Sequence, residues 1–547
     1  MILLQPLREI KRDLNLFISR SASQKATFYK IMNRLRRKDA IPRIDFRTLD
    51  SYIHPRVVTM LFLGFSSGLP LLLIFSSLSL WLREAEVERA TVTYFSWAAL
   101  AYSFKFIWAP VIDKLPLPWL SRRLGRRRGW LLLSQLGIVS AIAWMALTDP
   151  AISLMGMALA AVLLGFSGAT QDIVVDAYRI ESAEQSLQAY MAATYIAGYR
   201  MGMLVAGAGA LKLAAWFGQE AGYSYAAWRD AYLCMALAMG VGIATTLLIR
   251  EPERQSGPDR YLANLNDYLR FLALFLLVVG TFAAVFWASG FLLRAFFPGF
   301  AMTEFPVFNA MAGTIQLGSG ALGAWGMARL AVRQGIARQE MVKETYIDPV
   351  MDFFHRYGRA ALLILALIGF YRVSDILLAV ISNVFYADVG FDKDQIANIS
   401  KTFGLFMTIL GGFLGGMLAH RYGVMPILFL GALLACATNL LFVLLAQTGP
   451  DVMMLIIVIA ADNLSGGLAS AAFVAYLSGL TRISFTASQY AIFTSLMTLV
   501  PKFLGGYSGG VVDSIGYSAF FTGTALLGLP VLALIWLVGR RHRKQDD

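Results

Sequence analysis

Six ionisable residues lie deep inside long apolar segments of this chain, each more than ten residues into its segment. They are Lys105, Arg200, Arg372, Asp375, Asp462 and Lys502. A charged side chain near the centre of a bilayer costs about 2.5–3.5 kcal/mol on insertion scales. We therefore expect these six to face a polar cavity rather than lipid. Such a cavity inside a membrane bundle is typical of a transporter.

The composition agrees with a polytopic membrane protein. Of 547 residues, 58% are hydrophobic and 15% are charged, and the mean hydropathy is +0.62. The two cysteines and four histidines are scattered, which argues against a disulfide framework or a metal site. No zinc-protease, nucleophile-elbow or Walker-type motif is present. We expect no enzymatic activity, no metal and no cofactor.

The net charge of +13 is concentrated in segments that flank the apolar ones. Residues 1–50 hold twelve Lys or Arg, and residues 114–128 hold six, whereas 83–89 and 148–153 are acidic or nearly neutral. The positive-inside rule then places both termini in the cytoplasm and predicts an even number of spans. This distribution argues against a nucleic-acid partner. Residues 1–55 are predicted to form a basic cytoplasmic arm, interfacial or disordered.

Apolar windows of about 20 residues predict fourteen spans. A first set of six occupies residues 56–250, a polar linker with two additional spans occupies 251–357, and a second set of six with a basic tail occupies 358–547. The predicted spans are 56–82, 92–113, 130–148, 152–177, 188–215, 228–249, 269–294, 306–331, 358–385, 397–419, 424–446, 450–480, 486–512 and 518–539. We expect the additional pair to be peripheral.

The two sets of six carry similar features at nearly constant offsets. Gly64-Phe65 and Gly369-Phe370 lie in the first spans of each set, and Arg200 and Lys502 each stand seven residues before a glycine. These pairs favour an internal duplication, which is common in transporters.

The basic loop resembles the cytoplasmic signature of the major facilitator superfamily. Asp113 is followed by Arg122-Arg123 and then by Gly125-Arg126-Arg127-Arg128-Gly129. In that superfamily such a loop forms a charge latch of the inner gate, so the resemblance implies gating roles for Asp113, Arg126 and Arg127. The alternative is that these arginines anchor the loop on anionic lipid.

Several longer segments resemble the AmpG muropeptide permeases. They are LFLGFSSGLPLLL, AYSFKFIWAPVIDKL, RRRGWLLLSQ, SGATQDIVVDAYRIE, GYRMGMLVAG, DNLSGGLASAAFVAYLSGLT and TASQYAIFTSL. The resemblance implies proton-driven import of GlcNAc-anhydromuramyl peptides from periplasm to cytoplasm. Acetyl-coenzyme A transporters of the same wider family share some of these features, so another anionic solute is the alternative substrate.

The deep cations suit an anionic cargo. Lys105, Arg200, Arg372 and Lys502 outnumber the two deep acids, and guanidinium groups bind carboxylates through two hydrogen bonds. Gln171 is a good partner for sugar hydroxyls, and Tyr102, Tyr199 and Tyr371 stand next to charged candidates. The alternative for Arg372 is an ion pair with Asp375, three residues along the same helix. Lys105 could instead pair with an acid of another helix.

Proton coupling needs a carboxylate whose protonation changes with exposure, and Asp375 and Asp462 are the candidates by depth. A structural, hydrogen-bonded Asp is the alternative for each. In the fourth span Asp172, Asp176 and Arg179 share one helical face near the cytoplasmic end. We expect a gating role for them, with a static charge pair as the alternative.

The sequence therefore predicts an all-helical, major facilitator-type transporter of about 14 spans in the inner membrane of a Gram-negative bacterium. Its expected partners are a small anionic glycopeptide, protons and the lipid bilayer, and we expect a monomer. Two alternative functions belong to other classes of protein: a membrane sensor that does not transport, and an integral-membrane enzyme. The enzyme is disfavoured because no nucleophile, base or metal cluster lies within the spans.

Overall fold

The computed structural model describes residues 46–88, 91–92, 95, 98, 101–218, 223–253, 265–296, 306–392, 395–505 and 508–546. The chain divides into a short unit, Met1–Ile53, and a large unit, His54–Asp547. In the short unit the structure describes the helix α2 (Phe46–Ile53). Most of the predicted basic arm lies outside the described residues.

The first half of the large unit is built from helices that are interrupted in places. They are α3 (Pro55–Leu72), η1 (Leu73–Ser77), α4 (Leu78–Glu84), α6 (Ala101–Phe104), η3 (Lys105–Ile107), α7 (Ala109–Lys114), α8 (Leu120–Leu124), α9 (Arg126–Ala146), α10 (Leu154–Ser182), α11 (Gln185–Leu204), η4 (Val205–Gly209), α12 (Ala210–Phe217), α13 (Tyr225–Ala238) and α14 (Gly240–Leu248). Pro70 lies within α3, just before the π-helical turn η1. Proline has no N–H group to donate, so it interrupts the regular hydrogen bonds of the helix at this point.

The linker and the second half continue as helices. They are α15 (Leu265–Phe296), α17 (Pro306–Arg333), α18 (Gln339–Val342), η6 (Lys343–Ile347), α19 (Asp348–Tyr357), η7 (Gly358–Ala360), α20 (Ala361–Phe370), α21 (Val373–Val389), η8 (Ile396–Phe403), α23 (Gly404–Tyr422), α24 (Val424–Thr448), α25 (Val452–Leu480), η9 (Ile483–Phe485), α26 (Thr486–Gly505) and α27 (Ser508–Asp546). Gly516, at φ 77°, bends α27. The described residues contain no strand.

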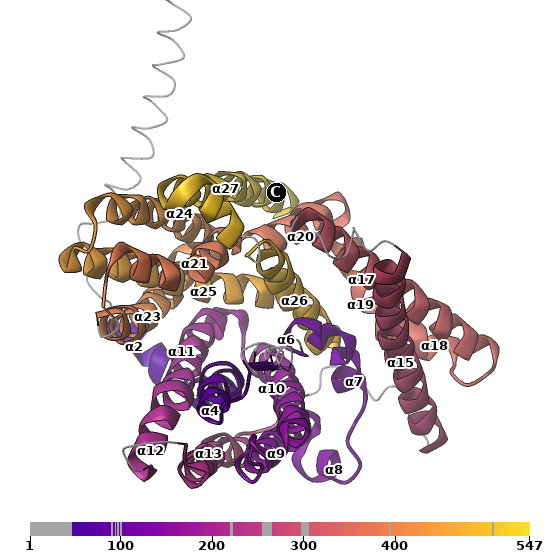
Figure 1. The fold of residues 1–547 in the computed structure, drawn as a ribbon. Coiled ribbons are helices and arrows are strands. Elements are labelled where there is room, and N and C mark those ends of the chain that lie inside the picture. The colour runs from indigo at the N-terminus through magenta and orange to yellow at the C-terminus, as the bar shows by residue number, and fades with distance from the viewer. Residues whose placement is uncertain are drawn as a thin grey trace, which may run out of the picture. The chain divides into compact units, whose positions relative to one another are not determined.

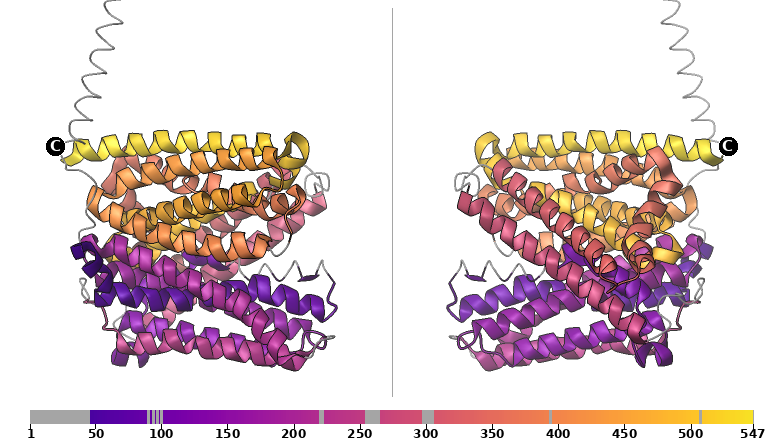
Figure 2. Two further views of the ribbon diagram at one scale, coloured as in Figure 1. Left: turned by 90° about the vertical axis from the view of Figure 1, so that its left-hand side faces the viewer. Right: turned by 90° about the vertical axis from the view of Figure 1, so that its right-hand side faces the viewer.

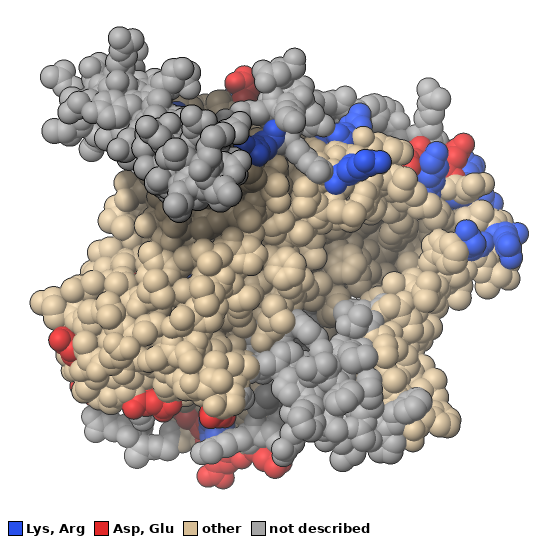
Figure 3. All heavy atoms as spheres, turned by 90° about the horizontal axis from the view of Figure 1, so that it is seen from above, with Lys and Arg blue, Asp and Glu red and all other residues tan. Residues whose placement is uncertain are grey.

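Eleven helical segments among the described residues are long and apolar enough to cross a membrane. They match eleven of the predicted spans. For the other three predicted spans, 92–113, 188–215 and 306–331, no segment of the described residues meets the same criteria of length and hydropathy. The total of 14 spans therefore stays a prediction. In Figure 3 most Lys and Arg atoms in view lie along one edge and most Asp and Glu along the other, with an uncharged band between. This separation is typical of a bundle that spans a bilayer.

The two halves form separate bundles, as Figures 1 and 2 show. One apolar core, around Trp81, Ile142 and Tyr232, lies in the first half. Two others, around Phe473 and Phe442, lie in the second half. The α15 and α17 helices pack on each other along one side of the bundles, and one end of the pair contacts α7. The peripheral position predicted for this pair is what the structure shows.

Glycines bring α3 and α11 into close contact. A Cβ atom added at Gly198 would overlap the main-chain oxygen of Leu61, and one at Gly68 would overlap that of Tyr199. Residues of both helices therefore reach the same interior, including Ser66 and Ser67 from α3 and Tyr195 from α11.

Candidate functional site

A polar cluster lies inside the first half, between α3, η3, α10 and α11. Lys105 Nζ stands 3.7 Å from Asp176 Oδ2, and Asp176 also pairs with Arg179 at 3.3 Å on the next turn of α10. Gln171 Nε2 donates to the hydroxyls of Ser66, at 3.2 Å, and Ser67, at 3.0 Å. Lys105 begins a short 3₁₀ turn between α6 and α7, a break that turns its side chain towards α10.

This cluster retains hydrogen-bonding capacity that the described residues do not use. Tyr102 Oη, Gln171 Oε1 and Asp172 Oδ1 are buried and have no hydrogen-bond partner within the described part of the chain. Buried polar atoms are rarely left without a partner because desolvation is costly. Such atoms fit the hydroxyl, amide and carboxyl groups of a polar solute.

The second half holds another polar cluster, built around Arg372 and Asp375. Arg372 Nη1 donates to Ser470 Oγ at 3.1 Å, and its Nε stands 3.9 Å from Asp375 Oδ2. Tyr371 stacks on Phe473 with ring centroids 4.3 Å apart, and its hydroxyl donates to the Leu428 carbonyl. The ion pair weighed from the sequence is therefore present, but it is long and both side chains are partly exposed.

Arg200 lies where the two clusters approach each other. The positive charge of Arg372 is close enough to act on Arg200 across the two halves. No hydrogen bond or ion pair of Arg200 is found among the described residues. Neighbouring cations without a shared acid attract an anion. Tyr199 precedes Arg200, and its ring lies 5.9 Å from that of Tyr195.

Asp462 lies on α25 near polar side chains of α23 and α24. The Thr438 hydroxyl of α24 donates to the Ala435 carbonyl, and the charge of Asp375 acts on Asp462. Its neighbour Asn463 accepts a hydrogen bond from Thr408 at 2.9 Å. Asp375 and Asp462 thus belong to one polar region of the second half. Lys502 lies in α26, but its side chain is outside the described residues.

Three of the predicted gate residues, Asp113, Arg127 and Arg179, contact the other half at the end that carries the basic loop. Asp176, also predicted to belong to the gate, pairs instead with Lys105 inside the first half. Asp113 accepts hydrogen bonds from the main-chain N–H groups of Ala487, at 2.9 Å, and Ser488, at 2.6 Å, and from the Ser488 hydroxyl. These N–H groups belong to the first turn of α26, which has no partner of its own for them. Asp113 on one half therefore caps a helix of the other half.

Two arginines hold this contact together. Arg127 is 1% exposed and forms ion pairs with Asp113, at 2.8 Å, and Glu181, at 2.5 Å. Glu181 also accepts from the Thr486 hydroxyl, again across the halves. Arg126 pairs with Glu181 at 3.7 Å and donates to the Asp113 carbonyl.

Further contacts at the same end extend the connection. Arg179 donates to Ser478 Oγ at 2.6 Å and lies over the ring of Tyr490. His420 Nδ1 lies 3.0 Å from the Ser186 carbonyl. Every hydrogen bond between the halves described here lies at this end, which we call the gate. The bundle is closed at the gate.

The comparisons with known proteins agree with this architecture. The sequence profile of the Major Facilitator Superfamily matches residues 356–547, and that of Acetyl-coenzyme A transporter 1 matches residues 56–216. The anhydromuropeptide permease of Escherichia coli K12 is 30% identical over 483 residues, which cover 88% of this chain and 79% of the permease. This chain belongs to the AmpG family of permeases in the major facilitator superfamily. A relative in Rickettsia felis named "Putative transporter AmpG 4" is 28% identical over 89% of this chain and 97% of its own length.

Solved structures support the fold of this AmpG-family chain. The proton:xylose symporter XylE with a bound sugar analogue has a TM-score of 0.52 at 13% identity, covering 90% of this chain and 95% of XylE. A double-tryptophan variant of XylE reaches 0.56 at 12% identity, covering 89% and 96%. The predicted family and fold are confirmed, and the protein is a multi-pass membrane transporter.

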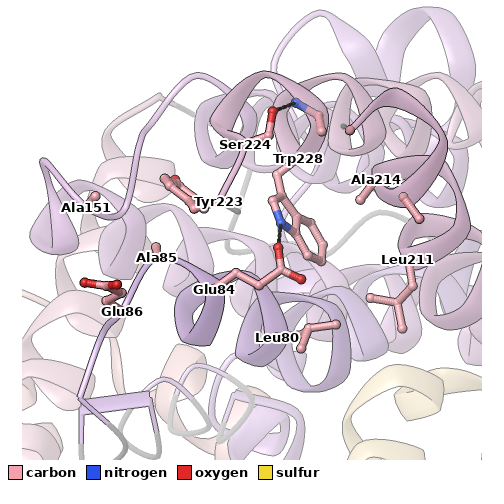
Figure 4. Close-up of a pocket in the computed structure, with 13 residues that line it drawn as sticks. Leu80, Glu84, Ala85, Glu86, Ala151, Leu211, Ala214, Tyr223, Ser224 and Trp228 are labelled. Carbon is pink, nitrogen blue, oxygen red and sulfur yellow. Dashed lines mark hydrogen bonds between the residues drawn. The ribbon is translucent and has the colours of Figure 1, made fainter. Parts of the chain in front are cut away.

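A cavity of about 860 Å³ lies in the first half, away from the residues predicted to bind substrate. Figure 4 shows Glu84, Tyr223 and Trp228 around it, with Trp228 Nε1 donating to Glu84 at 2.6 Å. None of the predicted site residues lines this cavity. Among the described residues, no group of three His, Cys, Asp or Glu could hold a metal ion.

Sequence reasoning missed several members of the gate. Glu181, Ser478, Thr486 and Ser488 all form hydrogen bonds between the halves. The start of α26, Thr486-Ala487-Ser488-Gln489, has the composition of a helix N-terminus, a signal that could have pointed to this contact. The partner from the other half could not be read from the chain.

Proposed function

We propose that this protein is a secondary transporter that imports GlcNAc-1,6-anhydro-N-acetylmuramyl peptides from the periplasm into the cytoplasm by alternating access, driven by the proton gradient. The observation that carries this proposal is the pairing of a closed polar gate at the basic end with polar clusters deep in both halves. In this account the solute enters from the opposite end. Both termini and the basic loop face the cytoplasm, as the charge distribution favours.

The cations would bind the carboxylates of the peptide. Arg200 and Arg372 come from different halves and the charge of Arg372 acts on Arg200, so a carboxylate bound by both would offset their repulsion. Lys105 is already paired with Asp176, and its role is to orient Asp176 and to donate a hydrogen bond to a solute oxygen when that pair loosens. Gln171, Tyr102 and Tyr199 would contact the sugar part. Tyr371 would contact the solute from the second half. Lys502 stays a candidate for binding the solute, because of its depth in α26.

The proton would be carried by Asp375 or Asp462. Both lie in the polar region of the second half, and Asp375 is held by a long ion pair that a solute carboxylate could replace at Arg372. Binding of the anionic solute to Arg372 would release Asp375, which then binds a proton more readily. Neutralising both charges lowers the cost of closing the cavity around them.

A second candidate is import of a different anion, such as acetyl-coenzyme A. The match of residues 56–216 to the profile of Acetyl-coenzyme A transporter 1 favours it. Phosphates would satisfy Arg200 and Arg372 as well as carboxylates do. Competition separates the two: unlabelled acetyl-coenzyme A in excess should leave uptake of a labelled muropeptide into proteoliposomes unchanged. Loss of uptake at concentrations near those of the muropeptide would favour the second candidate.

A further inference from the structure

The segment that joins the additional helices to the second half lies across the gate. This connector consists of α18, η6 and α19, residues Gln339–Tyr357, and it forms one nearly continuous helical stretch. Neither the sequence motifs nor the family comparisons assign a role to it. Its two ends contact the two sides of the gate in different ways.

On the α26 side polar, directional contacts accompany the apolar packing of Phe353 on Phe493. Asp352 of α19 accepts hydrogen bonds from Arg356, at 2.9 Å, from Gln489 Nε2, at 3.0 Å, and from Arg482. Arg482 and Gln489 stand on either side of the residues that Asp113 contacts. Asp352 therefore ties together the turn that leads into α26 and the first turn of that helix.

Gln489 completes this clamp. It is 1% exposed, and its amide nitrogen also donates to the Pro349 carbonyl at 2.8 Å. Its oxygen accepts from Arg356, at 3.1 Å, and from the main-chain N–H of Arg482, at 2.8 Å. The neighbour of Gln489 in the chain is Ser488, whose N–H group is bound by Asp113. The contacts of Gln489 with the connector thus help to fix the orientation of the Ser488 N–H group.

On the α7 side the contacts are apolar. Met341 of α18 is fully buried in a cluster with Val111 and Leu115, and these two residues flank Asp113 in the chain. Apolar contacts have no fixed direction and can slide or separate without leaving a hydrogen bond unmade. The π-helical turn η6 lies between the two kinds of contact.

We propose that the connector is a strap of the gate, in which Asp352 is a positioning residue that holds the start of α26 where Asp113 can cap it. When the gate opens, the strap stays with α26 through its polar contacts and leaves α7 through its apolar ones, with η6 as the bend. This inference rests on the alternating access proposed above.

The test measures opening of the gate directly. Ser182, buried beside Glu181, is replaced by cysteine in a Cys234→Ala, Cys436→Ala background, and a membrane-impermeant maleimide is applied from the gate side. Loss of charged hydrogen bonds in Asp352→Asn should raise the labelling rate roughly three- to tenfold. Asp352→Glu should return the rate to within about twofold of the parent, because it restores the charge.

The matched control is Asp348→Asn, the same change one turn earlier on α19, where no hydrogen bond of the side chain is found among the described residues. It should label at the parent's rate. Met341→Gln disturbs the apolar contacts of the strap with α7 and should also accelerate labelling. This variant replaces Asp352→Asn in the test if Asp352→Asn does not fold. Equal rates in Asp352→Asn and the parent, both monodisperse in detergent, would overturn the proposal, as would equal acceleration in Asp348→Asn. The assay needs no solute, so it stands apart from the identity of the substrate.

Discussion

Arg127 is the residue on which most of the gate contacts converge. It is buried between Asp113 and Glu181, so its removal leaves Asp113 without an ion pair and leaves Glu181 only its longer pair with Arg126. Breaking a buried ion pair in this way costs about 3–5 kcal/mol. We predict that Arg127→Ala lowers the melting temperature in detergent by several degrees, on the order of 2–4 °C per kcal/mol of lost stability.

The control for this change is Arg123→Ala, in the same loop. Arg123 is exposed and lies over the ring of Trp119, 4.6 Å from its centroid. Exposed contacts of this kind contribute little, so its melting temperature should stay near that of the parent. Equal melting temperatures for Arg127→Ala and Arg123→Ala would contradict the role given to Arg127.

Asp352 gives a pH dependence that can be checked outside the membrane spans. Burial raises the pKa of this carboxyl, but hydrogen bonds from Arg482 and Gln489 and the charge of Arg356 outweigh burial and lower the pKa below its ordinary value. A lowered pKa in the folded state contributes stability above about pH 4, and this contribution is lost as the pH falls through the folded-state value.

The measurement is the melting temperature of the parent and of Asp352→Asn at a series of pH values between about 3 and 7. The difference between them should be constant above about pH 5 and shrink as the solution becomes more acidic. A difference that grows on acidification would show that the sign is wrong.

At the scale of elements, the crossing of α3 and α11 depends on glycine. Gly198→Ala would drive a Cβ atom into the Leu61 carbonyl, which is main chain and cannot rotate away. Overpacking of this kind costs about 1–3 kcal/mol. We predict a lower melting temperature and slower uptake for Gly198→Ala. In Gly240→Ala a Cβ atom has open space, so both properties should be unchanged.

The helices themselves could be predicted because apolar windows of span length are a strong signal. Eleven of the predicted spans coincide with membrane-length helices in the described residues. The breaks at η1, at Lys105 and at η6 were not predicted, since they depend on packing against other helices rather than on local composition. The peripheral place of α15 and α17 followed from their lack of charge, but the strap beside them did not.

Pairings between different helices were the least predictable part of the site. Depth along a helix correctly brought Arg372 and Asp375 together because they share a face. It could not indicate that Lys105 pairs with Asp176, or that Asp113 contacts Ser488, because these partners come from different helices. The order of helices along the chain determines neither which helices pack against each other nor which face of each helix points into the bundle.

At the scale of the whole molecule, the account requires Arg200 to bind the solute rather than to hold the bundle together. Arg200 has no ion-pair partner among the described residues, so Arg200→Ala should fold normally. Loss of a charged hydrogen bond to a carboxylate corresponds to about 1.5–3 kcal/mol, or roughly ten- to a hundredfold in uptake efficiency. Arg294→Ala, a cation of the peripheral helix α15, is the control and should transport normally.

The most direct test of the account is uptake of labelled GlcNAc-anhydromuramyl tripeptide into proteoliposomes, with and without an imposed pH gradient, by the parent and by Asp462→Asn. The account predicts accumulation that depends on the gradient in the parent and is lost in the variant. Uptake that ignores the gradient in both would remove the proton coupling, and no uptake by folded parent protein would contradict the muropeptide as the substrate.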